Sequence, residues 1–149
     1  MPEFGASSKV KLMTCHPDLV RLFNEVVNAY DCQVIDGART EADQEDKVKR
    51  GFSKTLDSKH VVSQEHPLSR AADVAPYPVV WPLKLDAYPT PAELNQYVHT
   101  IGRFYDFHGF VLATANLLGI KIRWGGDWDM DKDFMDQTFD DLDHFELAE

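Results

Sequence analysis

Residues 53–75 read SKTLDSKHVVSQEHPLSRAADVA, and residues 141–147 read DLDHFEL. Together these two segments offer histidine imidazoles, an aspartate and spare carboxylates, which are the donors found in catalytic zinc sites. A catalytic zinc uses three protein ligands and keeps a fourth position for water, whose pKa it lowers to about 7, so that a nearby carboxylate can generate hydroxide. The two segments therefore predict a zinc hydrolase.

Helices and short strands are predicted on both sides of the first segment. Residues 17–30 form an amphipathic helical pattern that begins at Pro17, with an apolar face made of Leu19, Leu22, Phe23, Val26, Val27 and Tyr30. The pattern then predicts a strand at 32–36, a turn at 37–40, a polar helix at 41–50 that ends at Gly51, and a buried strand at 71–75.

A long helix is predicted to begin at Thr90, because Thr90-Pro91-Ala92-Glu93 is a capping box with proline in the first helical position, and to end at Gly119. Its buried stripe is expected to be Leu94, Val98, Ile101, Tyr105, Leu112 and Leu118. Strands follow at 120–124 and 144–148, on either side of an acidic loop at 125–139. No regular crossover helices separate the strands, so we predict an α+β fold with a small, mainly antiparallel sheet and helices packed on it.

The length and composition limit the classes of protein to which this chain can belong. The chain has 149 residues, of which 44% are hydrophobic, so we expect one catalytic domain over residues 1–149, with residues 1–8 as a flexible tail. Residues 1–20 lack the basic and apolar regions of an export signal, and no segment reaches the roughly 18 apolar residues of a membrane span. We therefore expect no signal peptide and no membrane insertion. We also expect the chain to be a monomer.

The net charge of −10 argues against nucleic acid and anionic membranes as partners, because both require a basic surface. The charge is uneven: in residues 127–149 the only lysine or arginine is Lys132, so this end should be able to hold cations. Cys15 and Cys32 are too few for a disulfide framework and lack metal-ligand spacing, so both are expected to be reduced and structural.

The acidic loop contains alternating aspartates that match the first, third, fifth and seventh positions of a calcium loop, namely Asp127, Asp129, Asp131 and Asp133. It departs from the EF-hand pattern in two places. Lys132 stands where a glycine makes the sharp turn, and Thr138 stands where a bidentate glutamate belongs. Calcium binding and an ordinary solvated acidic loop both remain open.

Five segments carry a resemblance to a known family, and they lie at 37–40, 53–60, 69–78, 122–128 and 141–147. In this order they resemble bacteriophage endolysins of the L-alanyl-D-glutamate peptidase type, which are similar to zinc D-alanyl-D-alanine carboxypeptidases and vancomycin-resistance D,D-dipeptidases. The resemblance covers residues 37–147. It implies the zinc D,D-peptidase-like fold, which zinc-bearing hedgehog-type signalling domains share.

The family pattern is Ser-x-His, then small-x-Ala-x-Asp, then acid-x-x-His, and it implies two histidines and one aspartate as zinc ligands with the acid as catalytic base. Asp73, His144 and the acid Asp141 match this pattern. The first histidine has two candidates. We favour His60, which follows Ser58 in the Ser-x-His context, while His66 is the alternative because it lies seven positions before Asp73.

Other polar residues near these motifs are candidates for supporting roles. Arg39, after a glycine-containing turn at a strand end, is expected to bind a substrate carboxylate or to stabilise the oxyanion; a salt bridge with Asp36 or Glu41 is its ordinary alternative. Gln44 on the next helix is a weaker candidate for substrate binding.

Asp141 should reach the site from the turn before the last strand. In a regular strand Asp143 would point to the face opposite His144, whereas Glu146 would share the face of His144 and could orient its imidazole. His16, His99 and His108 lack a partner at ligand spacing and are expected to be structural or surface residues.

Taken together, these features predict a zinc-dependent phage endolysin that hydrolyses the L-alanyl-D-glutamate bond of peptidoglycan stem peptides. It would remain in the host cytoplasm until a separate membrane-permeabilising protein gives it access to the cell wall. A D-alanyl-D-alanine carboxypeptidase on the same scaffold is the alternative enzyme. A non-catalytic zinc-binding module is the alternative from another class, and Asp141 argues against it.

Overall fold

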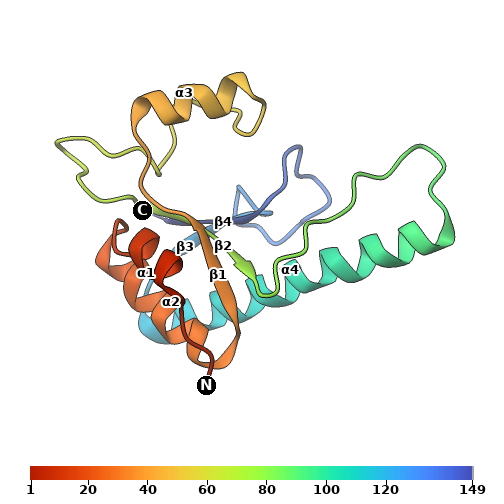
Figure 1. Cartoon of the computed structure of the whole chain (residues 1–149), viewed down its shortest axis with the longest axis horizontal. Helices are drawn as coiled ribbons and strands as arrows, with labels where there is room; N and C mark the ends of the chain where they lie inside the picture. Colours follow the sequence, from red (N-terminus) through yellow and green to blue (C-terminus); the bar gives the residue numbers. More distant parts are fainter. Residues whose placement is uncertain (149) are drawn as a thin grey trace.

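Four short strands form one antiparallel sheet in the computed structural model, which describes residues 1–148 (Figure 1). The strands are β1 (Cys32–Asp36), β2 (Ala71–Pro76), β3 (Ile122–Gly125) and β4 (Asp141–Leu147), and their order across the sheet is β1-β2-β4-β3. Each neighbouring pair is antiparallel, and every residue of β2 is buried. The predicted α+β class with an antiparallel sheet is confirmed.

Two helices, α2 (Pro17–Ala29) and α4 (Pro91–Leu118), cover one face of this sheet (Figure 1). The core lies between them and the strands, where the rings of Phe23 and Phe107 both meet Phe145 of β4 edge-on, at 5.6 and 5.8 Å between centroids. Burial of this apolar layer stabilises the fold. The opposite face of the sheet is left for the polar groups of β2 and β4.

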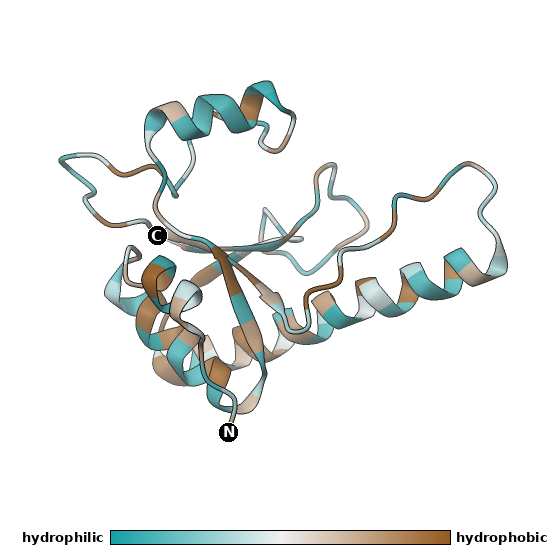
Figure 2. Ribbon diagram, in the orientation of Figure 1, coloured by the Kyte–Doolittle hydropathy of each residue, from teal (hydrophilic) through white to brown (hydrophobic). Residues whose placement is uncertain are grey.

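The third helix, α3 (Glu41–Lys49), stands on that opposite side, away from the core (Figure 1). Figure 2 shows that it is almost entirely hydrophilic, and only Gln44 is buried in it. Its first turn depends on a capping box in which Thr40 and Asp43 bond reciprocally to each other's backbone N–H.

The long helix α4 begins and ends where the sequence predicts. The side chains of Thr90 and Glu93 form the capping box, Pro91 occupies the first turn, and Gly119 ends the helix in the left-handed conformation with φ 70°. Local signals alone therefore determine both ends of this helix.

The predicted buried stripe of α4 is wrong in its first half. Leu94 and Val98 are 43% and 61% exposed, because the first turns of α4 extend beyond the sheet (Figure 1). The second half packs on α2 and the strands, and its buried residues are Thr100, Phe104, Phe107, His108, Val111 and Ala115. Tyr105, Leu112 and Leu118 lie at the margin of this core as partly buried residues.

The N-terminal segment differs from the expected flexible tail over residues 1–8. Helix α1 spans Ala6–Leu12, and Phe4 is only 3% exposed. The Oγ of Ser8 accepts a hydrogen bond of 3.1 Å from the backbone N–H of Val34 in the edge strand β1. The segment thus covers a sheet edge whose N–H groups would otherwise be unpaired.

Candidate metal centre

A cavity of about 970 Å³ opens over the polar face of the sheet. Its floor comes from β2 and β4, and its walls come from the segment before β2 and from the acidic loop between β3 and β4. Cationic side chains line it in spite of the chain's negative charge, namely Arg39, Lys47, Lys54, Lys59, Arg70 and Arg123. This lining is suited to a ligand that carries carboxylates.

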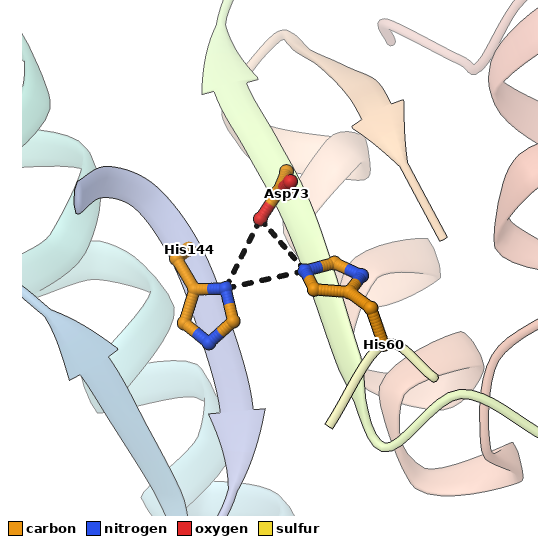
Figure 3. A group of neighbouring side chains, drawn as sticks. All are labelled: His60, Asp73 and His144. Atoms are coloured by element: carbon orange, nitrogen blue, oxygen red, sulfur yellow. Dashed lines mark hydrogen bonds and ion pairs between the residues drawn. The ribbon is translucent and has the colours of Figure 1, made fainter. Parts of the chain in front are cut away.

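Three buried side chains, His60, Asp73 and His144, meet one another (Figure 3), and Asp73 and His144 also line this cavity. His60 Nε2 lies 2.9 Å from Asp73 Oδ1, His144 Nδ1 lies 3.1 Å from the same oxygen, and the two nitrogens are 3.2 Å apart. Asp73 on β2 and His144 on β4 are direct partners in the antiparallel ladder, which explains their contact.

His60 comes from the segment before β2, which the backbone of Arg39 holds in place. The Arg39 N–H donates to the carbonyl of His60 at 2.8 Å, and the N–H of Val62 donates to the carbonyl of Arg39 at 3.0 Å. The structure therefore brings His60 to Asp73 and His144. His66 lies in a separate, smaller cavity beside Glu41 and Glu45.

The second ring nitrogen of each histidine is also bound. His60 Nδ1 donates to the carbonyl of Gly37 at 2.6 Å, and His144 Nε2 donates to Glu146 Oε2 at 2.9 Å. Since a carbonyl and a carboxylate only accept, these contacts leave His60 Nε2 and His144 Nδ1 as the nitrogens that face each other. Metal sites require this kind of support for their imidazole ligands.

Charge and burial around the three side chains favour a cation at their centre. Burial raises the pKa of Asp73, but the charges and hydrogen bonds of His60 and His144 outweigh it and hold that pKa well below its usual value. Burial lowers the pKa of His144, while its bonds to Asp73 and Glu146 outweigh this and raise it to about 10. Positive charge is thus strongly favoured here, and two imidazoles with one carboxylate form a donor set that fits a catalytic metal ion.

Arg39 is buried, at 9% exposed, and contacts three side chains. Its Nε donates to Asp36 Oδ2 at 2.7 Å and its Nη2 to Asp73 Oδ2 at 2.6 Å, while its Nη1 donates to Gln44 Oε1 at 3.2 Å. Asp36 and Asp73 are partners across β1 and β2, so one guanidinium can hold both. Three of its five N–H donors are used in these contacts, and the side chain also lines the cavity.

Gln44 lies behind Arg39 and not in the cavity. Its side chain is 1% exposed, and its amide donates to Ser53 Oγ at 2.9 Å and to the carbonyl of Thr55 at 2.7 Å. Gln44 therefore fixes both Arg39 and the wall segment 53–55.

Asp141 and Asp143 both line the cavity, together with His144. Asp141 is the first residue of β4, three residues earlier than the predicted start of this strand. The expectation that Asp143 faces away from His144 is wrong, because the ladder is irregular here: Trp124 pairs with Phe145, but the adjacent Gly125 pairs with Asp141.

The irregular pairing requires a glycine at position 125. A Cβ on Gly125 would overlap the carbonyl oxygen of Asp141. The two carboxyl groups that the irregularity brings into the cavity have raised pKa values. Burial and then the charge of Asp73 raise the pKa of Asp141, and the same causes, with the charge of Asp141, raise that of Asp143 well above its usual value.

Two residues that support His144 were missed by the sequence analysis. Arg123 Nε donates to Glu146 at 2.8 Å, and the ring of Trp128 lies 5.4 Å from that of His144. Arg123 and Glu146 are partners across β3 and β4. No local signal could have found this pair, because it depends on the register of strands far apart in the sequence.

His16, His108 and the two cysteines have structural environments, whereas His99 is exposed on α4. His16 Nδ1 accepts from the N–H of Asp18 at the start of α2, and His108 stacks on Trp124 at 4.0 Å. Cys15 and Cys32 are free and buried, as predicted.

One protein family, one phage enzyme and one bacterial enzyme that are similar to this chain have the same named activity. The model of the family described as phage L-alanyl-D-glutamate peptidase matches residues 2–148. The L-alanyl-D-glutamate peptidase of Escherichia phage T5 is 26% identical over 143 residues, which is 91% of this chain and 88% of the phage protein. The crystal structure of Serratia marcescens L-Ala D-Glu endopeptidase ChiX is similar with a TM-score of 0.64 and 27% identity, over 99% of this chain and 91% of that chain.

Proposed function

Because this chain belongs to the phage L-alanyl-D-glutamate peptidase family, we propose that it hydrolyses its substrate with a zinc ion held by His60, Asp73 and His144. Family membership makes the chain a hydrolase of peptidoglycan that acts as an L-alanyl-D-glutamate peptidase. The observation that carries the zinc proposal is the buried group of two imidazoles and one carboxylate, of which Asp73 and His144 line the cavity.

Zinc is the ion best suited to this donor set. Catalytic zinc sites combine three nitrogen or oxygen ligands from the protein with one open position, and the cavity leaves such a position accessible. When bound, zinc supplies Lewis acidity, which polarises the scissile carbonyl and acidifies the attacking water. Glu146 would hold His144 in the correct orientation, and Gly37 would do the same for His60.

Asp141 is our proposed general base. Its carboxylate lies in the same cavity, three residues before His144, and burial raises its pKa toward the range in which a carboxyl can both accept and return a proton. It would take a proton from the attacking water and deliver it to the leaving amine. Asp143, which lines the same cavity, is the residue from which this assignment must be distinguished.

Arg39 is proposed to act in two ways. Its contact with Asp73 Oδ2 leaves Asp73 Oδ1 facing the histidines, and its remaining N–H donors can stabilise negative charge on the substrate carboxylate or oxyanion. For Gln44, the buried position supports a positioning role through Arg39 in place of direct substrate binding.

The place of action follows from the substrate. The chain acts on the bacterial cell wall, and no helix within residues 1–148 has both the length and the apolar character needed to cross a membrane. We propose that the monomer accumulates in the host cytoplasm and reaches the wall once the membrane is permeabilised. Purified protein should therefore lyse permeabilised cells much faster than intact cells.

The bond that is cut can be identified by mass analysis of digested muropeptides. Cleavage between L-alanine and D-glutamate releases peptides with a new D-glutamate amino terminus. A D-alanyl-D-alanine carboxypeptidase would instead shorten the stem peptide by its terminal alanine. Loss of terminal alanine without the new amino terminus would contradict the proposal.

A further inference from the structure

The cavity has an aromatic wall apart from the triad of His60, Asp73 and His144. Trp81 comes from the extended segment between β2 and α4; it lines the cavity and is 50% exposed. Its ring stacks on that of Phe104 in α4, with 5.7 Å between centroids and 21° between the ring planes. A half-exposed tryptophan on the wall of a site is a surface on which a ligand can pack.

Two contacts hold this tryptophan in place. Phe104, on which its ring stacks, is buried at 1% exposed. Nη1 of Arg103 donates to the carbonyl of Pro78 at 2.9 Å and ties the segment to the same helix, α4. The indole of Trp81 therefore offers its other face from a fixed position. A ligand that packs there loses little affinity to the ordering of the side chain.

The strand pairing places Trp81 at one end of the cavity. β2 and β4 are antiparallel, with Asp73 opposite His144. The chain therefore leaves β2 beside the start of β4, where Asp141 lies, and continues to Trp81. Figure 1 shows the segment between β2 and α4 on this side of the sheet, away from the end of β4. Trp81 thus lies on the Asp141 side of the triad.

The other end of the cavity carries positive charge. Lys59 Nζ lies 3.6 Å from Glu146 Oε1, and Arg123 Nε donates to the same oxygen at 2.8 Å. Two cations share this carboxylate, so the group of three has a net positive charge. Glu146 follows His144 on β4, whereas the segment to Trp81 begins beside the start of that strand. The triad therefore lies between a cationic end and an aromatic end.

A peptidoglycan stem peptide has the same division of chemistry. Its L-alanine is joined through a lactyl group to the sugar N-acetylmuramic acid, which is uncharged in that linkage. The residues from D-glutamate onward carry free carboxylates. The L-alanyl-D-glutamate bond lies where the two parts meet, and one extended residue spans only about 3.5 Å. A substrate cut at the triad therefore brings its sugar close to the wall of the cavity.

We propose that Trp81 forms a subsite for the N-acetylmuramic acid ring, so that the chain cleaves glycan-linked stem peptides in preference to sugar-free ones. The C–H groups on the face of a sugar ring are apolar and can pack on an indole. The carboxylates of the peptide would point toward Lys59 and Arg123. This orientation rests on the proposed function, because it places the scissile bond at the triad.

Two matched substrates test the subsite on the full, zinc-loaded chain. One is the unreduced muropeptide, in which the sugar ring stays closed, and the other is the same stem peptide with only the lactyl group on L-alanine. Both have the same scissile bond and the same carboxylates, so the ratio of their kcat/KM values isolates the sugar. We expect the native chain to favour the muropeptide by about tenfold, the effect of one well-packed aromatic contact.

Trp81→Ala should abolish this preference, mainly through a higher KM for the muropeptide. Trp81→Phe should keep most of it, because a phenyl ring can still stack on Phe104. Tyr88→Ala is the control, since Tyr88 is exposed on the same segment but does not line the cavity, and its ratio should equal that of the native chain. A ratio measured on one preparation does not depend on the folded fraction, so partial unfolding of a variant cannot mimic the result.

The cationic end needs a variant of its own. Lys59→Gln should lower kcat/KM for both substrates by a similar factor, because both carry the same carboxylates. A change of the ratio in Lys59→Gln would overturn the proposed orientation. Equal cleavage of both substrates by the native chain, a native ratio in Trp81→Ala, or an equal loss of preference in Tyr88→Ala would overturn the subsite.

Failure of the proposed function gives a different result. If neither substrate is cut between L-alanine and D-glutamate, the zinc peptidase is wrong, and calorimetric titration with both substrates still decides the subsite. Tighter binding of the muropeptide by the native chain than by Trp81→Ala would support it, and equal binding would overturn it.

Discussion

Asp73 divides its two carboxylate oxygens between different partners. Oδ1 lies 2.9 and 3.1 Å from the nitrogens of His60 and His144, while Oδ2 accepts from Arg39 at 2.6 Å. The aspartate is thus held by a fixed cation on one side and is available to a metal on the other. Such preorganisation of a ligand is what a catalytic metal site requires.

The role of Asp141 can be tested by removing its charge. Asp141→Asn should keep zinc, because the three proposed ligands remain, but turnover should fall by about 100- to 10,000-fold, the usual contribution of general acid-base catalysis. Activity and zinc content should be measured on the same preparation.

Two neighbouring variants make this test specific. Asp140→Asn should have a mild effect, because Asp140 is exposed and does not line the cavity. Asp143→Asn should cost less turnover than Asp141→Asn. A larger loss from Asp143→Asn would assign the base to Asp143.

The first ligand can be identified from metal content. His60→Ala should lose zinc and activity, because His60 Nε2 faces Asp73 and His144. His66→Ala should retain both, because His66 lies in the smaller cavity beside Glu41. Zinc retained by the first variant and lost by the second would reverse the assignment.

His108 makes the stability of the chain depend on pH. Burial lowers its pKa to about 4 from the ordinary value of 6.5. The unfolded chain therefore binds more protons than the folded chain between these two values, so the stability is fully present above pH 6.5 and is lost as the pH falls toward 4. The stability lost in this window should be roughly 3 kcal/mol.

This effect can be measured by denaturant unfolding. The free energy of unfolding should be determined for the native chain and for His108→Phe at several pH values. The phenyl ring can stack on Trp124 without titrating, so the variant should lose less stability across the window. Parallel stability curves for the two proteins would contradict the assignment.

At the scale of elements, the site depends on how β4 pairs with its neighbours. The regular pairing of β2 with β4 sets His144 opposite Asp73. The irregular pairing of β3 with β4 admits Asp141 and Asp143 to the same cavity. A single strand therefore supplies a candidate metal ligand and the candidate base because one end of its ladder is regular and the other is not.

Helix α4 has two halves with different contributions to stability. Phe107→Ala should lower the free energy of unfolding by about 3–5 kcal/mol, because a fully buried ring between α2 and the sheet is lost. Val98→Ala should change it by less than about 0.5 kcal/mol, because Val98 lies on the half that extends beyond the sheet. Chemical denaturation measures both, and similar losses from both variants would show that the first half is packed in solution.

At the scale of the whole molecule, a bound metal ion would connect the segment before β2 to the sheet. We predict one zinc per chain at the triad, with activity lost after chelation and restored by added zinc. The melting temperature should also fall on zinc removal, because an ion that binds the folded chain stabilises it. Full wall-cleaving activity in metal-free protein would refute the zinc mechanism.

The sequence by itself determined the features that depend on a few neighbouring residues. Capping boxes at Thr40 and Thr90 and the glycine at 119 set the helix ends, and the sequence located the strands approximately, although β4 begins at Asp141 and not at His144. The spacing from Asp141 to His144 and the Ser58-x-His60 context identified the candidate residues of the site, together with the family they resemble. These signals are local, so no knowledge of the fold was needed.

Only the tertiary structure decided which candidate site residues lie together and which side chains of a strand or helix face the cavity or the core. The path of the segment before β2 brings His60, and not His66, to Asp73, and the β3–β4 register places Asp143 in the cavity. The extent of the sheet decides which half of α4 is buried. Each outcome depends on the relative position of elements distant in sequence, which is set by packing and strand register and not by local pattern.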